Sequence, residues 1–164
     1  MINYEEFESA YIEAAMTLCS DDNDDDIIAN YSVKDISPGL RAEVEFDCKA
    51  FIALAEEIFA KYPEAARAAE EAFSAGRWTL SEHAGNDFWM TRNGHGAGFW
   101  DGDWNGGWAS GLDITISDGE TGDIVDQIFR REYVCPELGE ELTCASHKFG
   151  ESEWYVYEEI IYGS

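Results

Sequence analysis

Apolar positions recur at intervals of three and four residues near the start of the chain, which is the spacing of one helix face. This stripe predicts a first helix and consists of Tyr4, Phe7, Tyr11, Ala15 and Leu18. The intervening positions carry carboxylates, at Glu5, Glu6, Glu8 and Glu13. We therefore expect an amphipathic helix with one apolar face toward a core and one acidic face toward solvent.

A second apolar stripe covers residues 40–62 and predicts a long second helix. Ser37 and Pro38 precede it, a pair typical of an N-cap followed by the first helical position. Pro63 ends this helix and can open a third, Ala-rich helix that continues through Phe73 and stops at Gly76. The sequence therefore predicts three helices before residue 77.

From Trp78 onward, aromatic residues and glycines replace the helical period. Residues 88–92 and 98–101 flank the glycine-rich stretch 93–96, a pattern typical of two strands joined by a tight turn. We therefore predict a β-hairpin here, with Trp89 and Trp100 as core residues beneath the helices.

The last part of the chain mixes strand and helix patterns. Residues 112–116 alternate apolar and polar positions and predict a strand, whereas residues 124–129 fit either a strand or a short helix. Residues 140–149 predict a helix ended by a glycine, and residues 154–157 and 160–162 predict a terminal hairpin. The expected fold class is α+β, with N-terminal helices packed on a small antiparallel sheet, one further C-terminal helix and a terminal hairpin.

The 164 residues fit a single domain over 1–164, mainly helical over 1–76 and richer in aromatic residues, glycines and strands over 77–164. No apolar run is long enough for a membrane span, and the N-terminus is acidic where a secretion signal would be basic. We therefore expect a cytoplasmic protein without membrane contact. The cysteines form no CxxC pair, which favours reduced, partly buried thiols; they are Cys19, Cys48, Cys135 and Cys144.

Charge is the most unusual property of the composition. The chain has 35 acidic against 10 basic side chains and a formal net charge of −25, whereas a net charge of about 2–8 in magnitude keeps a small domain soluble. Such a surface repels nucleic acid and anionic membranes and attracts basic grooves, including those that hold DNA or RNA. Adaptation to high salt, without any dedicated partner, is the alternative explanation of this charge.

Carboxylates on a rigid helix can imitate phosphates. Duplex DNA presents one negative charge per about 1.7 Å of axis, and side chains at i and i+4 on a helix lie about 6 Å apart. The acidic rows on the second helix and the acidic run after the first helix, which we expect to be a solvated loop, are therefore the candidate contacts to a partner. They are Glu43, Asp47, Glu56, Glu57, Asp21, Asp22, Asp24, Asp25 and Asp26.

The stretch DFWMTRNGHGAGFWD at residues 87–101 is the most distinctive motif. It resembles the core of a family of small, largely uncharacterised bacteriophage and mobile-element proteins that share DFW, a hydrophobic residue and TRNGHGAGFWD. The region around Tyr11, the segments at 30–32 and 48–51 and the late segment 142–151 are similar too. The resemblance implies a phage or plasmid origin but no established activity or site residues.

Other chemistry has weaker support in the sequence. Arg92, His95 and Asp101 could converge at the predicted hairpin tip as the site of a small metal-dependent or hydrolytic enzyme. Residues 101–106 match the first half of a calcium loop, but Leu112 stands where the closing Glu is required. His83, Asp87, His95 and His147 lack the spacing of a known metal site. We therefore expect no metal and no cofactor.

The leading hypothesis combines the charge with the phage-like motif. It is a non-enzymatic, phage-type inhibitor that binds a host nucleic-acid-binding or antiviral defence protein in the host cytoplasm, of the anti-CRISPR or anti-restriction type, by nucleic-acid mimicry. The partner would have a basic groove, and the chain itself would not bind nucleic acid. Two alternatives stay open, namely the small enzyme at residues 92–101 and an accessory or structural phage protein.

Overall fold

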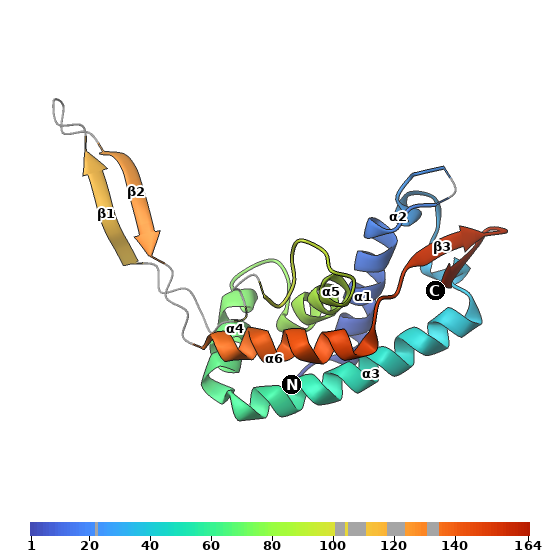
Figure 1. Cartoon of the computed structure of the whole chain (residues 1–164), viewed down its shortest axis with the longest axis horizontal. Coiled ribbons are helices and arrows are strands. Elements are labelled where there is room, and N and C mark those ends of the chain that lie inside the picture. Colours follow the sequence, from blue (N-terminus) through green and yellow to red (C-terminus); the bar gives the residue numbers. More distant parts are fainter. Residues whose placement is uncertain (22, 101–103, 105–110, 118–123, 131–134) are drawn as a thin grey trace.

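The computed structural model describes residues 1–21, 23–100, 104, 111–117, 124–130 and 135–164. Figure 1 shows the helices gathered in one body, with α1 beside α5, and α3 and α6 running together along one side. In chain order the elements are α1 (Tyr4–Leu18), α2 (Ile27–Asn30), η1 (Val33–Asp35), α3 (Pro38–Lys61), α4 (Pro63–Ser74), α5 (Leu80–Arg92), β1 (Gly111–Ser117), β2 (Ile124–Arg130), α6 (Pro136–Ser146), η2 (His147–Phe149), β3 (Trp154–Tyr157) and β4 (Ile160–Gly163).

The first three predicted helices are confirmed as α1, α3 and α4. At the start of α1, the Asn3 side chain accepts a hydrogen bond from the backbone N–H of Glu6 at 3.1 Å. At the start of α3, Ser37 Oγ accepts one from the N–H of Leu40 at 3.3 Å, with Pro38 in the first turn. Both contacts satisfy N–H groups that have no partner inside the helix.

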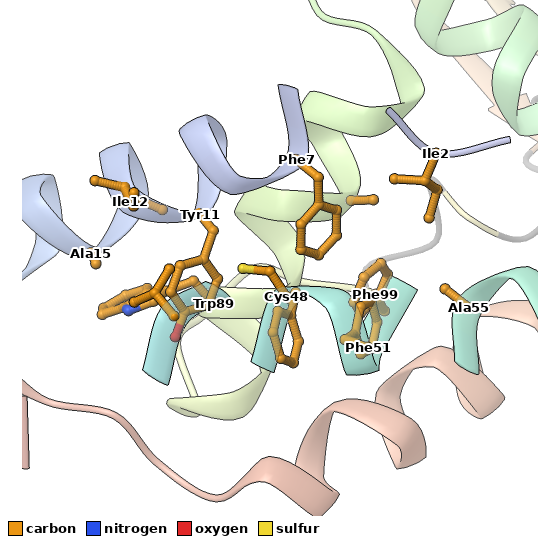
Figure 2. Close-up of a cluster of buried hydrophobic side chains, with 14 of the residues drawn as sticks. Ile2, Phe7, Tyr11, Ile12, Ala15, Cys48, Phe51, Ala55, Trp89 and Phe99 are labelled. Carbon is orange, nitrogen blue, oxygen red and sulfur yellow. The ribbon is translucent and has the colours of Figure 1, made fainter. Parts of the chain in front are cut away.

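The core between α1, α3 and α5 contains a cluster of aromatic side chains among aliphatic ones (Figure 2). Phe51 of α3 stacks on Phe88 of α5 with ring centroids 4.1 Å apart, and Phe7 of α1 packs within 5.9 Å of both rings. All three side chains are fully buried. Aromatic contacts of this kind add to the hydrophobic contribution of the buried area and tie the three helices together.

Gly85 allows α1 and α5 to approach closely. A Cβ atom at this position would lie 2.1 Å from the carbonyl oxygen of Phe7, which is a backbone atom and cannot move aside. Only glycine therefore fits this crossing point.

The predicted hairpin over residues 88–101 is wrong, because residues 80–92 form α5. Thr79 begins this helix with a capping box, in which its side chain accepts from the N–H of Glu82 and the Glu82 side chain accepts from the N–H of Thr79. Such a box is a strong helix start. Trp89 is buried as predicted, with 1% of its surface exposed, but Trp100 lies beyond the helix and is 42% exposed.

The strands form two separate antiparallel pairs, β1 with β2 and β3 with β4. The predicted strand at 112–116 is confirmed as part of β1, and residues 124–129 belong to a strand, not a helix. Figure 1 shows the β1–β2 hairpin standing away from the helices. The terminal hairpin is confirmed, and its turn residues Glu158 and Glu159 both have positive φ, at 50° and 62°.

The fold class α+β is confirmed, although in the described part of the chain the helices pack mainly on one another. The terminal hairpin joins them through the N–H of Ser37, which donates to the carbonyl of Ile161 at 2.9 Å. The last predicted helix begins earlier than expected, because Pro136 opens α6, and Gly150 follows η2 with φ 70°. None of the described helices is long and apolar enough to span a bilayer.

All four cysteines are free thiols. Cys19 and Cys48 are buried, Cys135 is half-buried and Cys144 is exposed. Burial of the first two agrees with the expectation of structural thiols.

Candidate functional site

Glu43 and Asp47 are one turn apart on α3, but they are not the pair of free carboxylates that the sequence predicts. Glu43 is exposed, whereas Asp47 Oδ2 forms an ion pair with Arg92 Nη1 at 2.8 Å. The two side chains are 14% and 2% exposed, so the pair is largely removed from water. The charge of Asp47 is therefore balanced by Arg92 inside the protein, and Asp47 does not contribute to the predicted acidic row.

The Arg92 side chain donates hydrogen bonds to four partners. Besides Asp47, it donates to the hydroxyl of Tyr11 at 2.8 Å, to the carbonyl of Phe149 at 2.9 Å and to the carbonyl of Gly150 at 2.7 Å. Its guanidinium group thereby connects α1, α3, α5 and η2 and faces the interior. The predicted enzymatic role of Arg92 at a hairpin tip therefore has no geometric basis.

Glu56 and Glu57 are both exposed on α3, but they do not form a row. Consecutive residues of an α-helix point about 100° apart around its axis. Glu56 Oε1 also accepts a hydrogen bond from the backbone N–H of Ile2 at 3.3 Å. The two carboxylates thus face different directions, and one of them holds the N-terminal segment against α3.

The acidic run after α1 is only partly a solvated loop. Asp21 is 7% exposed and accepts hydrogen bonds from the backbone N–H groups of Asn23 and Asp25 and from the side-chain amide of Asn30. The Asn30 amide and then the Asn23 N–H hold the pKa of Asp21 below its usual range, because they stabilise the carboxylate. Asp24, Asp25 and Asp26 are exposed, and Asp22 lies outside the described residues.

The other candidate residues are dispersed as well. His95 stacks on Trp89 with ring centroids 4.9 Å apart, and His83 stacks on Phe73 at 4.0 Å. Asp87 accepts a hydrogen bond from Trp104 Nε1 at 2.6 Å inside the core. Asp101 and the rest of the calcium-loop match, apart from Trp104, lie outside the described residues. Among the residues described, no three His, Cys, Asp or Glu side chains are grouped closely enough to hold a metal ion.

A surface groove between α1 and α5 was not predicted from the sequence. This α1–α5 groove has a volume of about 580 Å³ and is open to solvent. The segment before α5 contributes one wall of the groove. The lining residues are Glu5, Glu6, Ser9, Ala10, Glu13, Ala14, Thr17, Leu18, Trp78, Glu82, Asn86 and Met90.

The lining of the α1–α5 groove combines apolar side chains with glutamates, and we call these glutamates its rim. Leu18 and Trp78, two of these apolar residues, are 43% and 41% exposed. Among the residues that line the groove, four are Glu and none is Lys or Arg. An uncompensated acidic rim around apolar surface can attract a cationic group and bury an apolar one at the same time.

Two of the rim carboxylates are held in place by Thr79. Its hydroxyl donates to Glu6 Oε2 at 2.8 Å, and its backbone N–H donates to Glu82 Oε2 at 2.6 Å. One residue thus gathers a carboxylate from α1 and another from α5 at the N-terminal end of α5. The positive end of the helix dipole favours negative charge there.

A second groove, of about 550 Å³, lies on the other side of α1 and includes Ile28, Val33 and Arg41 in its lining. Glu5, Ser9 and Glu13 border both grooves, because they form the outward edge of α1. Arg41 partly compensates the acidic charge of this second groove. The α1–α5 groove is therefore the more strongly acidic of the two.

One of the two walls of this groove could be predicted from the sequence. The four-residue spacing of Glu5, Ser9 and Glu13 places them on one edge of a correctly predicted helix. The opposite wall belongs to α5 and the segment before it, which begins with the T-L-S-E capping box at 79–82. Because the pattern of residues 88–92 predicts a strand, the sequence does not predict this second wall.

Comparisons with protein-family models, with curated proteins and with solved structures found no match to this chain. The resemblance of residues 87–101 to phage proteins therefore stays a prediction. In the structure these residues form the second half of α5 and the turns that follow, up to residue 100.

Proposed function

We propose that this chain is a non-enzymatic inhibitor that binds a basic, nucleic-acid-binding protein of a host cell and prevents that protein from engaging DNA or RNA. The proposed functional class is that of the anti-CRISPR and anti-restriction proteins of phages. Binding would be stoichiometric, with carboxylates of the inhibitor occupying positions that phosphates occupy in the natural complex.

The acidic rim of the α1–α5 groove, in a chain of net charge −25, is the observation that carries this proposal. Glu43 and Glu57 add exposed carboxylates on a further helix, α3. Four ion pairs are seen among the described residues, and one of them, between Arg92 and Asp47, is internal. Most of the acidic charge is therefore uncompensated and available to a basic partner.

Charged groups of this kind act mainly on specificity and association rate. A basic groove that binds phosphates is attracted to a surface of excess carboxylates over distances of about a Debye length, near 10 Å at 0.1 M salt. The same surface is repelled by nucleic acid, so the inhibitor competes for the protein and not for its ligand.

The decisive experiment is a competition assay. The immobilised chain captures proteins from a bacterial lysate, and each captured protein is purified and mixed with a fluorescent oligonucleotide that it binds. Added chain should lower the fluorescence anisotropy to that of the free oligonucleotide. Formation of a ternary complex with unchanged oligonucleotide affinity would contradict the proposal.

Charge reversal provides the matched control. Glu5→Lys with Glu13→Lys should abolish competition, because both residues lie on the groove rim. Glu64→Lys with Glu70→Lys changes the net charge equally on the exposed side of α4 and should retain it. Equal effects of the two double variants would indicate that only total charge matters, as expected for a generic acidic surface.

A further inference from the structure

We infer that the α1–α5 groove holds an amphipathic helix of the partner protein, with apolar side chains in the groove and Lys or Arg residues against its rim. This inference rests on the proposed function, because it describes how the same basic partner is held. It adds an apolar anchor to what would otherwise be recognition by charge alone.

The apolar part of the groove lining supports an anchor of this kind. Ala10 and Ala14 contribute small side chains to the lining, and Leu18, Trp78 and Met90 contribute large apolar ones. The volume of about 580 Å³ is comparable to that of small-molecule pockets, about 300–1,000 Å³, and leaves room for apolar side chains of an occupant. Leu18 and Trp78 both border the groove, so their exposed apolar surface is available to an occupant.

The rim determines the charge of the occupant. Glu5, Glu6 and Glu13 follow α1, and Glu82 stands opposite at the start of α5. An anionic or neutral helix would meet repulsion or unpaired carboxylates, whereas Lys or Arg residues on both flanks of an apolar stripe would pair with them. Charge complementarity thus selects a basic occupant.

The length of the groove favours a helix over a small organic cation. Its lining extends along α1 from Glu5 to Leu18, which corresponds to about 20 Å at 1.5 Å per residue. A helix with apolar residues at i, i+4, i+7 and i+11 covers about 16 Å and matches the usual mode of helix-in-groove recognition. A small cation would cover only one part of the rim and none of the apolar length.

The test uses two synthetic peptides of identical composition and charge. The patterned peptide has Leu at i, i+4, i+7 and i+11 with Lys on both flanks, and the scrambled peptide distributes the same residues without a stripe. Binding to the full chain is measured by isothermal titration calorimetry at 0.1 M and 1 M salt. We expect the patterned peptide to bind at least about tenfold more tightly, and we expect this preference to persist at 1 M salt, where charge attraction is screened.

Uncharged variants locate the anchor. Leu18→Ser with Trp78→Ser removes two groove walls and should abolish the preference for the patterned peptide at both salt concentrations. Phe46→Ser with Tyr157→Ser removes two apolar side chains that are 72% and 59% exposed outside the groove, and it should leave the preference unchanged. Far-UV circular dichroism and urea unfolding confirm that each variant is folded.

A second pair of variants tests the charge on the outward edge of α1, which the α1–α5 groove shares with the second groove. Glu5→Gln with Glu13→Gln should weaken patterned-peptide binding at 0.1 M salt but not at 1 M, whereas Glu64→Gln with Glu70→Gln should have little effect at either. Equal binding of the two peptides, equal losses in the groove and control variants, or spermine competing fully with the patterned peptide would overturn the inference. Because no nucleic-acid-binding protein is present, these results are independent of the competition assay that tests the proposed function.

Discussion

Arg92 Nη1 on α5 lies 2.8 Å from Asp47 Oδ2 on α3, and the same nitrogen also donates to the hydroxyl of Tyr11 on α1. One buried guanidinium group thus joins the three helices that enclose the aromatic core. Arginine suits this position because its planar group presents several donors in fixed directions, which a lysine ammonium group does not.

Removing the carboxylate of Asp47 should destabilise the protein strongly. Asp47→Ala leaves the charge of Arg92 buried without its partner, and breaking a buried pair in this way costs about 3–5 kcal/mol. Glu43→Ala, one turn away and exposed, should change the free energy of unfolding by about 0.5 kcal/mol or less. Urea unfolding followed by circular dichroism measures both. A loss of stability for Asp47→Ala as small as the one expected for Glu43→Ala would contradict the buried ion pair.

Gly85→Ala should separate α1 from α5. The added Cβ would meet the carbonyl oxygen of Phe7 at 2.1 Å, and overpacking against atoms that cannot move costs about 1–3 kcal/mol or more. Gly39→Ala is the control, because nothing lies within 4 Å of its Cβ position on α3. It should leave stability unchanged or raise it by up to about 1 kcal/mol through better helix propensity. Thermal unfolding distinguishes the two; equal melting temperatures would contradict the close approach.

Asp21 should contribute stability that depends on pH. Its pKa is lowered in the folded state by hydrogen bonds from the Asn30 amide and the Asn23 N–H. A lowered pKa means that the contribution is fully present above the unfolded value of about 3.9 and disappears as the pH falls through the folded value. Asp21→Asn should therefore destabilise the protein at pH 7 and progressively less toward pH 3.

The measurement is the difference in urea midpoint between the parent and Asp21→Asn at each pH. Using a difference cancels the general relief of repulsion that acidification causes in so acidic a chain. Asp25→Asn removes the same charge from an exposed neighbour and should shift the midpoint little at either pH. A constant difference for Asp21→Asn between pH 7 and pH 3 would contradict a charge-dependent role.

The cysteines should differ widely in reactivity toward iodoacetamide. Burial raises the pKa of the Cys48 thiol, and the nearby Glu8 carboxylate adds to this effect, so little thiolate is available to react. Cys144 is exposed on α6 and should be alkylated first at pH 8. Cys48 should react only in denaturant. Mass spectrometry of the peptides gives both rates, and comparable rates in the native protein would contradict the buried position of Cys48.

Prediction from the sequence succeeded where a segment carries its own boundary residues and a clear period. Ser37 and Pro38 open α3, Pro63 opens α4, and apolar residues recur on one face between them, so propensity, capping and burial all agree. The terminal hairpin was also predictable, because its alternating apolar residues are interrupted only by a short acidic turn.

Prediction failed at α5, where local features disagree. Aromatic residues and a nearby glycine-rich turn favour strands, but the capping box at Thr79 and Glu82 and the burial of Leu80, Ala84 and Phe88 on one face produce a helix. Gly85 lies inside this helix and allows its close contact with the backbone of Phe7. Tertiary packing overrode the local preference.

By itself, the sequence determined the α+β composition, the amphipathic first helix and the large excess of carboxylates, because these follow from local periodicity and residue counts. Only the tertiary structure decided which carboxylates are available. Asp47 is neutralised by an arginine 45 positions away in the chain, Asp21 turns inward, and Glu6 is brought to Glu82 by Thr79. The partners of Asp21 are local, at most nine positions away in the chain. The Asp47 and Glu6 pairings depend on how helices cross, and a crossing depends on the simultaneous packing of side chains that are distant in sequence.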